Sequence, residues 1–280
     1  MGDDNWLHDH RGDTVVVKFG GNAMVDDALK RDFAADVVAL LRAGIRPVVV
    51  HGGGPQISAA LQRAGIPTEF RGGYRFTSTA AIRVVHDVLA DEVSGELTAL
   101  INEHGDYATA VSGEHESLFS GRRRGVVVDG QEVDLGHVGD IDEVNPASVV
   151  ALLDAGRIPV ISSIAPDSAH PGHSLNVNAD AAASAVAIAL RASWLLVLTD
   201  VPGLYRDWPD RTSLVSRIDT LELEALLPTV TSGMIPKVLA CLDAVRGGVG
   251  HAAIVDGTKS HALVRLPFGV GGTTVEPALH

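Results

Sequence analysis

The sequence is poor in the residues that mark several protein classes. Among its 280 residues there is one cysteine, Cys241, and aromatic residues make up only 4%. One cysteine cannot form a disulfide within the chain, which favours a reducing compartment, and we expect a cytoplasmic protein. With so few aromatics the core must be built from Val, Leu, Ile and Ala, which the 46% hydrophobic content supplies.

Long apolar runs and an excess of positive charge are missing too. The longest apolar stretches, such as residues 181–190, fall far short of the roughly 20 residues of a membrane span. Residues 1–11 carry acids and histidines where a secretory signal has basic and then apolar residues. The balance of 22 Lys and Arg against 35 Asp and Glu gives a net charge of −13, which argues against a general binder of phosphate backbones. We therefore expect neither a membrane nor a nucleic acid as partner.

The sequence does contain a regular alternation of strand and helix patterns. A β-branched run at 14–17 leads into a glycine pair, and an apolar helical face follows until Gly44. A second apolar run at 47–50 leads into three glycines and Pro55, which suits the first turn of a helix. Repetition of this order predicts an α/β protein: a three-layer α/β/α sandwich around a mainly parallel sheet.

Four further features bear on the organisation. A long helix is expected after Ser78, with an apolar stripe that buries against a lobe or a second subunit. Asp129-Gly130 predicts a tight hairpin, and the glycine-flanked arginines 122–124 predict a solvated loop. The loop 165–174, rich in Pro, Gly, His and Ser, is the expected boundary between two lobes that share one sheet, 1–172 and 173–280.

Two glycine-rich turns indicate a ligand site. Ligands of open α/β sheets lie beyond the carboxyl ends of the strands, where Gly20-Gly21 and residues 52–54 are expected. Backbone N–H groups without a nearby Cβ can approach an anion closely. Tight turns need glycine anyway, but two such turns with Lys18 beside the first favour a phosphate or carboxylate site.

Two polar segments add to this interpretation. Asn176, Asn178 and Asp180 precede an apolar helix, and a helix cap needs only one such residue. Lys237 lies just inside another helix start, where the helix dipole disfavours a cation. A role on the surface alone explains that lysine poorly.

Seven segments in order resemble the amino acid kinase superfamily and, within it, the acetylglutamate kinase family. Together they cover the chain from about residue 14 to about residue 274, and they are residues 18–24, 51–55, 73–77, 134–139, 176–180, 198–203 and 232–238. The resemblance implies phosphoryl transfer from ATP with Mg²⁺ to the side-chain carboxylate of N-acetyl-L-glutamate, as in arginine biosynthesis, by a homodimer. A related N-acylated acid, such as a 2-aminoadipate derivative, is the alternative substrate.

The resemblance also implies roles for individual residues. Lys18 and Lys237 flank the transferring phosphoryl group, and Asp180 holds both lysines. The amino-acid substrate is bound by Gly52, Gly53, Arg75, Asn176 and Asn178. ATP is bound by Gly20, Gly21, Asp200, Gly203, Gly233 and Met234. No protein ligand for a metal is expected, and no general base is needed because a carboxylate is already ionised at neutral pH.

The sequence departs from the family pattern in three places. Residues 90–95 and the turn 112–115 have lost basic residues that the family usually carries. These two changes are compatible with a modified substrate. About a dozen residues precede Thr14, and the stretch 261–269 lacks an acid, so we expect no inhibition by arginine.

An α/β hydrolase is the alternative from another class, because residues 51–54 resemble an oxyanion-hole loop. It would need a G-x-S-x-G elbow after a strand. The nearest candidate, around Ser174, has Asn176 in place of the last glycine and is expected in a loop.

Overall fold

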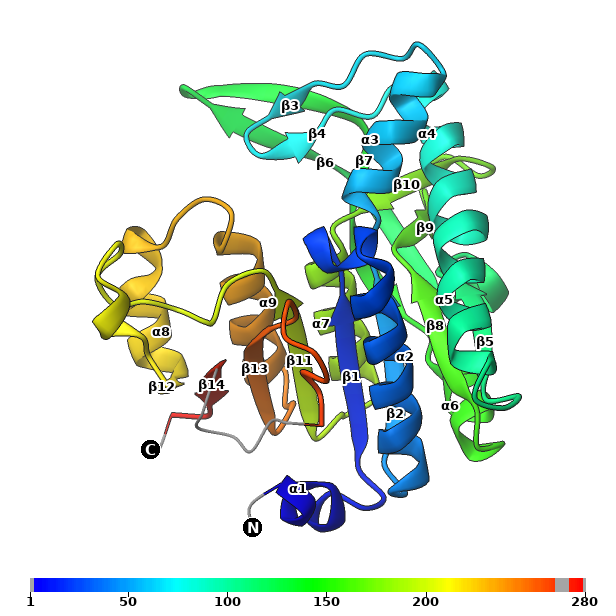
Figure 1. Cartoon of the computed structure of the whole chain (residues 1–280). Helices are drawn as coiled ribbons and strands as arrows, with labels where there is room; N and C mark the ends of the chain where they lie inside the picture. Colours follow the sequence, from blue (N-terminus) through cyan, green and yellow to red (C-terminus); the bar gives the residue numbers. More distant parts are fainter. Residues whose placement is uncertain (1–2, 265–271, 279–280) are drawn as a thin grey trace.

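The computed structural model describes residues 3–264 and 272–278, so part of the stretch 261–269 lies outside the described residues. Its main element is an eight-stranded sheet ordered β12-β14-β13-β11-β1-β2-β8-β5 (Figure 1). The strands are β1 (Thr14–Phe19), β2 (Arg46–His51), β5 (Ala108–Ser112), β8 (Ile158–Ser162), β11 (Trp194–Thr199), β12 (Arg217–Asp219), β13 (His251–Asp256) and β14 (Gly272–Glu276). All neighbours are parallel except β13 and β14, which confirms the mainly parallel sheet.

Helices cover both faces of this sheet. One face packs against α2 (Asp27–Arg42), α3 (Gly54–Arg63), α4 (Thr79–His86) and α5 (Ser94–Asn102). The other packs against α6 (Ala147–Asp154), α7 (Ala179–Ala189), α8 (Thr220–Leu226) and α9 (Ile235–Arg246). Along β1, Val15 and Val17 belong to the first apolar cluster and Val16 to the second, because successive side chains of a strand face opposite sides. The predicted three-layer sandwich is confirmed.

Two smaller sheets stand beside the main one. Four strands follow the order β6-β7-β10-β9, with β6 (Phe119–Val128), β7 (Gln131–Val144), β9 (Ile164–Pro166) and β10 (Ser174–Val177). A short hairpin consists of β3 (Phe70–Arg71) and β4 (Tyr74–Arg75). Arg71 donates a hydrogen bond to the Asp134 carbonyl at 2.8 Å, which holds this hairpin beside β7 (Figure 1).

The remaining elements are short helices. They are α1 (Asp3–Asp9), the 3₁₀ turns η1 (Gly21–Val25), η3 (His115–Ser117), η4 (Arg211–Ser213) and η5 (Leu227–Thr229), and a π-helix η2 (Asp87–Val93). The predicted long helix is present as α4, η2 and α5 in succession, and the Ser78 hydroxyl caps it by accepting from the Ala81 N–H. Its apolar stripe, from Ile82 to Ile101, is buried in the chain's own core, with Leu100 partly buried.

The hairpin prediction is confirmed and the loop prediction beside it is wrong. Asp129 and Gly130 both have positive φ and join β6 to β7. The arginines 122–124 lie within β6, where they form ion pairs with Asp142, Asp167 and Asp140. These partners come from other segments of the fold, so nothing in the local sequence distinguishes this strand from a solvated loop.

The expected boundary loop connects β9 to β10, which are antiparallel neighbours in the four-stranded sheet. In the main sheet, the strands that precede this loop (β5, β8, β2 and β1) form one half, and the strands that follow it (β11 to β14) form the other. One sheet therefore runs through both parts of the chain.

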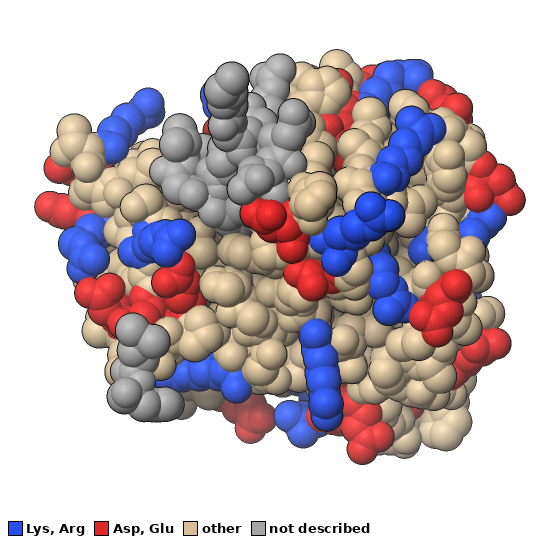
Figure 2. All heavy atoms as spheres, turned by 90° about the horizontal axis from the view of Figure 1, so that it is seen from below, with Lys and Arg blue, Asp and Glu red and all other residues tan. Residues whose placement is uncertain are grey.

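The surface has no single-sign patch on the face that Figure 2 shows. There, Lys and Arg side chains are interspersed with Asp and Glu. Within the described ranges, no helix is long and apolar enough to cross a membrane.

Candidate active site

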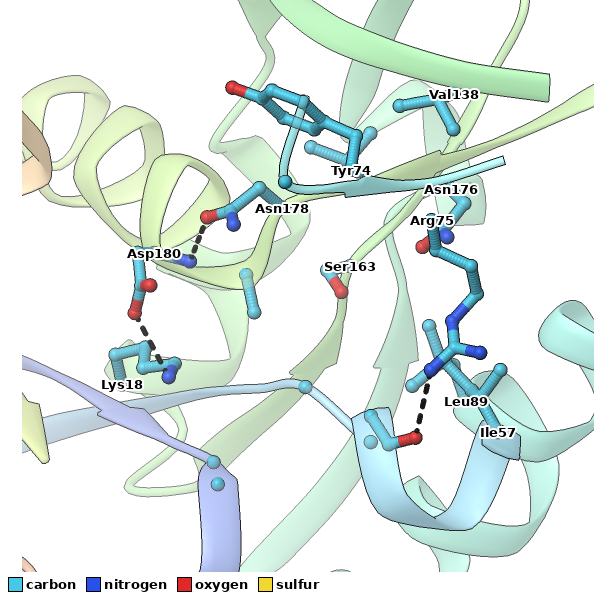
Figure 3. Close-up of a pocket in the computed structure, with 18 of the residues that line it drawn as sticks. Lys18, Ile57, Tyr74, Arg75, Leu89, Val138, Ser163, Asn176, Asn178 and Asp180 are labelled. Atoms are coloured by element: carbon cyan, nitrogen blue, oxygen red, sulfur yellow. Dashed lines mark hydrogen bonds and ion pairs between the residues drawn. The ribbon is translucent and has the colours of Figure 1, made fainter. Parts of the chain in front are cut away.

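A polar cavity of about 240 Å³ lies at the carboxyl ends of β1, β2 and β8 (Figure 3). Its lining includes most residues that the sequence indicated: Lys18, Gly20, Gly21, Gly52, Gly53, Arg75, Asn176, Asn178 and Asp180. This position is where ligands bind in open α/β sheets, as the glycine turns predicted.

Asp180 connects two lysines from distant segments. Its Oδ1 lies 2.9 Å from Lys18 Nζ, and its Oδ2 lies 3.4 Å from Lys237 Nζ. Lys18 is the fifth residue of β1 and Lys237 the third of α9. The structure therefore brings together the three residues that the resemblance names as catalytic.

Local structure positions this carboxylate. The Asn178 side chain caps α7 by accepting from the N–H groups of Asp180 and Ala181, at 2.8 and 3.1 Å. Asp180 lies in the first turn of α7, where the helix dipole favours a negative charge. Lys237 lies in the first turn of α9, which is unfavourable for a cation, and the facing carboxylate compensates for this.

The two lysines favour the ionised form of Asp180. Burial by itself would raise the pKa of Asp180, but the charges of Lys18 and Lys237 and their hydrogen bonds outweigh it and lower that pKa. The carboxylate is only 4% exposed and Lys18 only 6%. An ionised carboxylate therefore holds two ammonium groups, and of the three residues Lys18 and Asp180 line the cavity, whereas Lys237 does not.

At two positions of the turns a side chain would crowd a neighbouring residue. A Cβ at Gly20 would lie 2.8 Å from Lys18 Nζ, which Asp180 already holds in place. A Cβ at Gly53 would lie 2.7 Å from Leu89 of the π-helix, which also lines the cavity. The turns thus leave space for the lysine and for the packing of η2 against the site.

Arg75 lies on the other side of the polar cavity from Lys18 (Figure 3). Its guanidinium donates to Ser58 Oγ at 2.8 Å and to the Gly54 carbonyl at 3.2 Å. The guanidinium is half-buried, and burial lowers its pKa. Among the described residues no carboxylate forms an ion pair with it. Asn176 also lines the cavity and donates to Thr77 Oγ1 at 3.3 Å.

A second cavity, of about 180 Å³, is mostly apolar. It is lined by Val201, Gly203, Leu204, Tyr205, Trp208, Thr229, Val230, Thr231 and Met234. A Cβ at Gly203 would lie 2.7 Å from Thr273 Oγ1, so the loop can pack against β14 only with glycine there. Tyr205 and Trp208 have ring centroids 5.3 Å apart.

Two of the predicted ATP-binding residues line neither cavity. Asp200 accepts a hydrogen bond at 3.0 Å from Asn22, the residue after the first glycine pair. Gly233 lies in the turn before α9, and nothing in the structure requires glycine there.

Sequence reasoning missed one residue that supports the polar cavity and several that line the two cavities. Ser58, which holds Arg75, is one helical turn after Gly54 and carries no motif. Tyr74 and Ser163 line the polar cavity, and Tyr205 and Trp208 line the apolar one. Trp208 is 52% exposed, and a tryptophan in a loop rich in Asp and Arg is a signal that could have indicated a binding surface.

The donors of the polar cavity suit anions. Both oxygens of Asp180 face ammonium groups, and the other donors include guanidinium, amide and glycine N–H groups. Mg²⁺ is usually held by substrate phosphates, water and one or two carboxylates. Asp200, tied to the first glycine turn by Asn22, has the chemistry to contribute one such carboxylate.

A separate trio, His86, Asp87 and Asp91, has potential metal-ligating atoms within 4.8 Å of one another. It lies in α4 and η2, both aspartates are exposed, and none of the three lines the polar cavity. The expectation that the protein supplies no metal site of its own stays a prediction.

Comparison with known proteins agrees with the fold. The model of the amino acid kinase family matches residues 13–256. The chain is 62% identical over 276 residues to the acetylglutamate kinase of Clavibacter michiganensis subsp. michiganensis, which covers 98% of this chain and 91% of that protein. It is 57% identical over 273 residues to the acetylglutamate kinase of Leifsonia xyli subsp. xyli, with 98% and 90% covered.

A solved structure extends the likeness to three dimensions. The N-acetylglutamate synthase of Neisseria gonorrhoeae, in complex with coenzyme A and N-acetyl-glutamate, matches with a TM-score of 0.83 at 24% identity. The match covers 100% of this chain and 63% of that one, and at this identity it concerns the fold alone. The chain therefore belongs to the amino acid kinase family, in the group of the acetylglutamate kinases.

Proposed function

We propose that the protein transfers the γ-phosphoryl group of ATP to the side-chain carboxylate of N-acetyl-L-glutamate and releases an acyl phosphate and ADP. The observation that carries this proposal is the Lys18–Asp180–Lys237 arrangement, of which Lys18 and Asp180 line the polar cavity. The near-full-length identity to acetylglutamate kinases supports the choice of substrate.

The chemistry needs positioning and charge more than proton transfer. The attacking carboxylate is ionised at neutral pH, so no base has to prepare it. Negative charge spreads over the oxygens of the transferring group, and positive groups fixed in advance stabilise it. Lys18 and Lys237 supply that charge, and Asp180 fixes their positions without neutralising both.

The α-carboxylate of the amino acid would bind at Arg75. A guanidinium can form two parallel hydrogen bonds with a carboxylate, and here Ser58 and the Gly54 carbonyl hold it in place. Asn176 on β10 and Asn178 at the start of α7 supply further polar groups. The substrate would then lie with its side chain towards Lys18.

The nucleotide would reach the phosphoryl site from the apolar cavity. Tyr205, Trp208 and Met234 suit an adenine ring, and the glycine turns suit the phosphates. Mg²⁺ bound to the phosphates would neutralise part of their charge, and Asp200 would lie near the nucleotide. Gly233 belongs to the loop between the apolar cavity and Lys237.

We further infer that the two parts of the chain bind different substrates. Residues 1–172 would bind the amino acid and residues 173–280 the nucleotide, which agrees with the two halves of the main sheet.

We also propose a cytoplasmic homodimer. The edge strand β5, at the end of the sheet, offers backbone groups that a second copy can pair with. Light scattering that gives the monomer mass would contradict the dimer.

The hydrolase alternative has no support in the geometry. Ser174 donates to Glu114 at 2.7 Å and lines a different cavity from the glycines of the loop 51–54. The alternative substrate, a 2-aminoadipate derivative, has the same reacting carboxylate as N-acetyl-L-glutamate. The experiment below distinguishes the two substrates.

The test is to incubate the protein with ATP, Mg²⁺ and single N-acylated acids, and to trap acyl phosphate with hydroxylamine. The panel contains N-acetyl-L-glutamate, N-acetyl-L-aspartate and N-acetyl-2-aminoadipate. We expect the highest kcat/KM with N-acetyl-L-glutamate. Hydroxamate from none of the acids would refute the proposed function, and preference for the aminoadipate would correct the substrate.

A further inference from the structure

His51 is a buried histidine that the reaction, as described so far, does not use. It is the last residue of β2 and is fully buried directly before the glycines that line the polar cavity. Its Nδ1 lies 3.0 Å from the carbonyl oxygen of Gly52. A carbonyl oxygen only accepts, so Nδ1 must carry the proton and donate it.

The rest of the ring agrees with this tautomer. Nε2 is buried and has no hydrogen-bond partner in the part of the chain that the structure describes. Burial lowers the pKa of His51 to about 4, so the ring is neutral at physiological pH. A neutral imidazole with its single proton on Nδ1 is therefore a fixed donor rather than a proton carrier.

The bond to Gly52 determines the direction of the next N–H group. The Gly52 carbonyl and the Gly53 N–H belong to one planar trans peptide, in which the two groups point in opposite directions. Because the carbonyl is turned towards the buried ring, the Gly53 N–H is turned away from it. That N–H has no acceptor among the described residues, and Gly53 lines the cavity.

Glycine makes this orientation easy to lose. A peptide between two residues that lack a Cβ can rotate at little steric cost. A rotated peptide would present the Gly52 carbonyl to the cavity, and an oxygen there would repel the anionic substrates. His51 supplies the bond that distinguishes the two orientations.

We infer that His51 is a positioning residue that holds the Gly52–Gly53 peptide so that its N–H faces the transferring phosphoryl group. The inference rests on the proposed function, because it assigns the N–H to that reaction. His51 itself touches neither substrate.

The test compares substitutions that differ in where they place a donor. His51→Asn keeps an amide N–H near the position of Nδ1, His51→Gln moves it towards the position of Nε2, and His51→Leu removes it. We expect kcat to fall about 10²-fold in His51→Leu and in His51→Gln, the scale for one preorganised donor. We expect His51→Asn to keep kcat within about fivefold, with KM for both substrates little changed in all three.

The Asn and Gln variants bury the same amide group, so their comparison holds even if His51→Leu does not fold. Equal kcat in these two folded variants would overturn the inference. A fall in activity that follows only the melting temperature would do the same, because it would indicate a purely structural residue. If the wild type forms no acyl phosphate, the proposed function fails instead.

The pH profile supplies a second readout. Since His51 stays neutral, the wild type and His51→Asn should have the same profile between pH 6 and pH 9. An inflection in the wild type that disappears in His51→Asn would show that the ring exchanges a proton, which contradicts a positioning role.

Discussion

The cavity around Lys18 combines charged groups and glycines with apolar side chains, whereas the cavity around Trp208 has no charged residue in its lining and is mainly apolar. Both lie in the same α/β framework, one beside the first half of the main sheet and one beside the second. The polar cavity offers a ligand fixed charges and N–H groups beside its apolar side chains. The apolar cavity can bind a ring by excluding water and needs little charge. The two regions therefore predict different losses when single side chains are removed.

The largest expected loss concerns the two lysines that pair with Asp180. We expect Lys18→Ala or Lys237→Ala to lower kcat by about 10²-fold or more, because each removes a preorganised positive group from the developing charge. Steady-state rates with saturating substrates measure this. Lys259→Ala, at a lysine that is 74% exposed, serves as the matched control and should leave kcat unchanged. Normal turnover in a lysine variant would remove that lysine from the catalytic role.

Loss of Arg75 should act on one substrate only. We expect Arg75→Ala to raise KM for N-acetyl-L-glutamate by about tenfold or more, the cost of a charged hydrogen-bonded contact. The KM for ATP should not move. Arg63→Ala, at an exposed arginine at the end of α3, is the control. A change in the KM for ATP alone would contradict the assignment of Arg75 to the amino-acid substrate.

The apolar cavity predicts the opposite selectivity. We expect Trp208→Ala to raise KM for ATP by about fivefold, since stacking of a base on an aromatic ring contributes about 1–3 kcal/mol. The KM for N-acetyl-L-glutamate should stay constant. Leu221→Ala removes an exposed apolar side chain of α8 and should change neither constant. An unchanged KM for ATP in Trp208→Ala would exclude this cavity as the adenine site.

The smallest effect is expected at Cys241. The thiol is fully buried on α9, and burial raises its pKa, so little reactive thiolate forms. Treatment with a thiol reagent at pH 8 should leave activity unchanged, and the thiol should react only after unfolding. Rapid labelling of the native enzyme would show that α9, which also carries Lys237, opens readily.

Local signals explain what could be predicted from the sequence. The alternation of β-branched and helical patterns gave the sheet and its order of elements, and Asn178 was recognisable as a helix cap. Lys237 stood out because its position conflicts with the helix dipole. These features depend on neighbours in the sequence.

What could not be predicted depends on contacts between distant segments. Ser58 supports Arg75 across 17 positions, and the arginines of β6 meet carboxylates on β7 and after β9. The π-helix places Leu89 against Gly53, and no propensity rule predicts such an insertion. The periodicity of apolar residues gives no information about these pairings. The residues that sequence reasoning missed are therefore those that distant segments hold in place.

The central position of β1 also governs how the chain can fold. Val15 pairs with Pro47 on one side and with Trp194 on the other. A fragment that ends before β11 leaves β1 as an open edge, with unpaired backbone groups available to other chains. Pairing of such distant strands is slow to form. The ribosome must therefore have synthesised β11 before β1 can pair on both sides. The isolated first half of the chain is expected to aggregate rather than to fold as an independent unit.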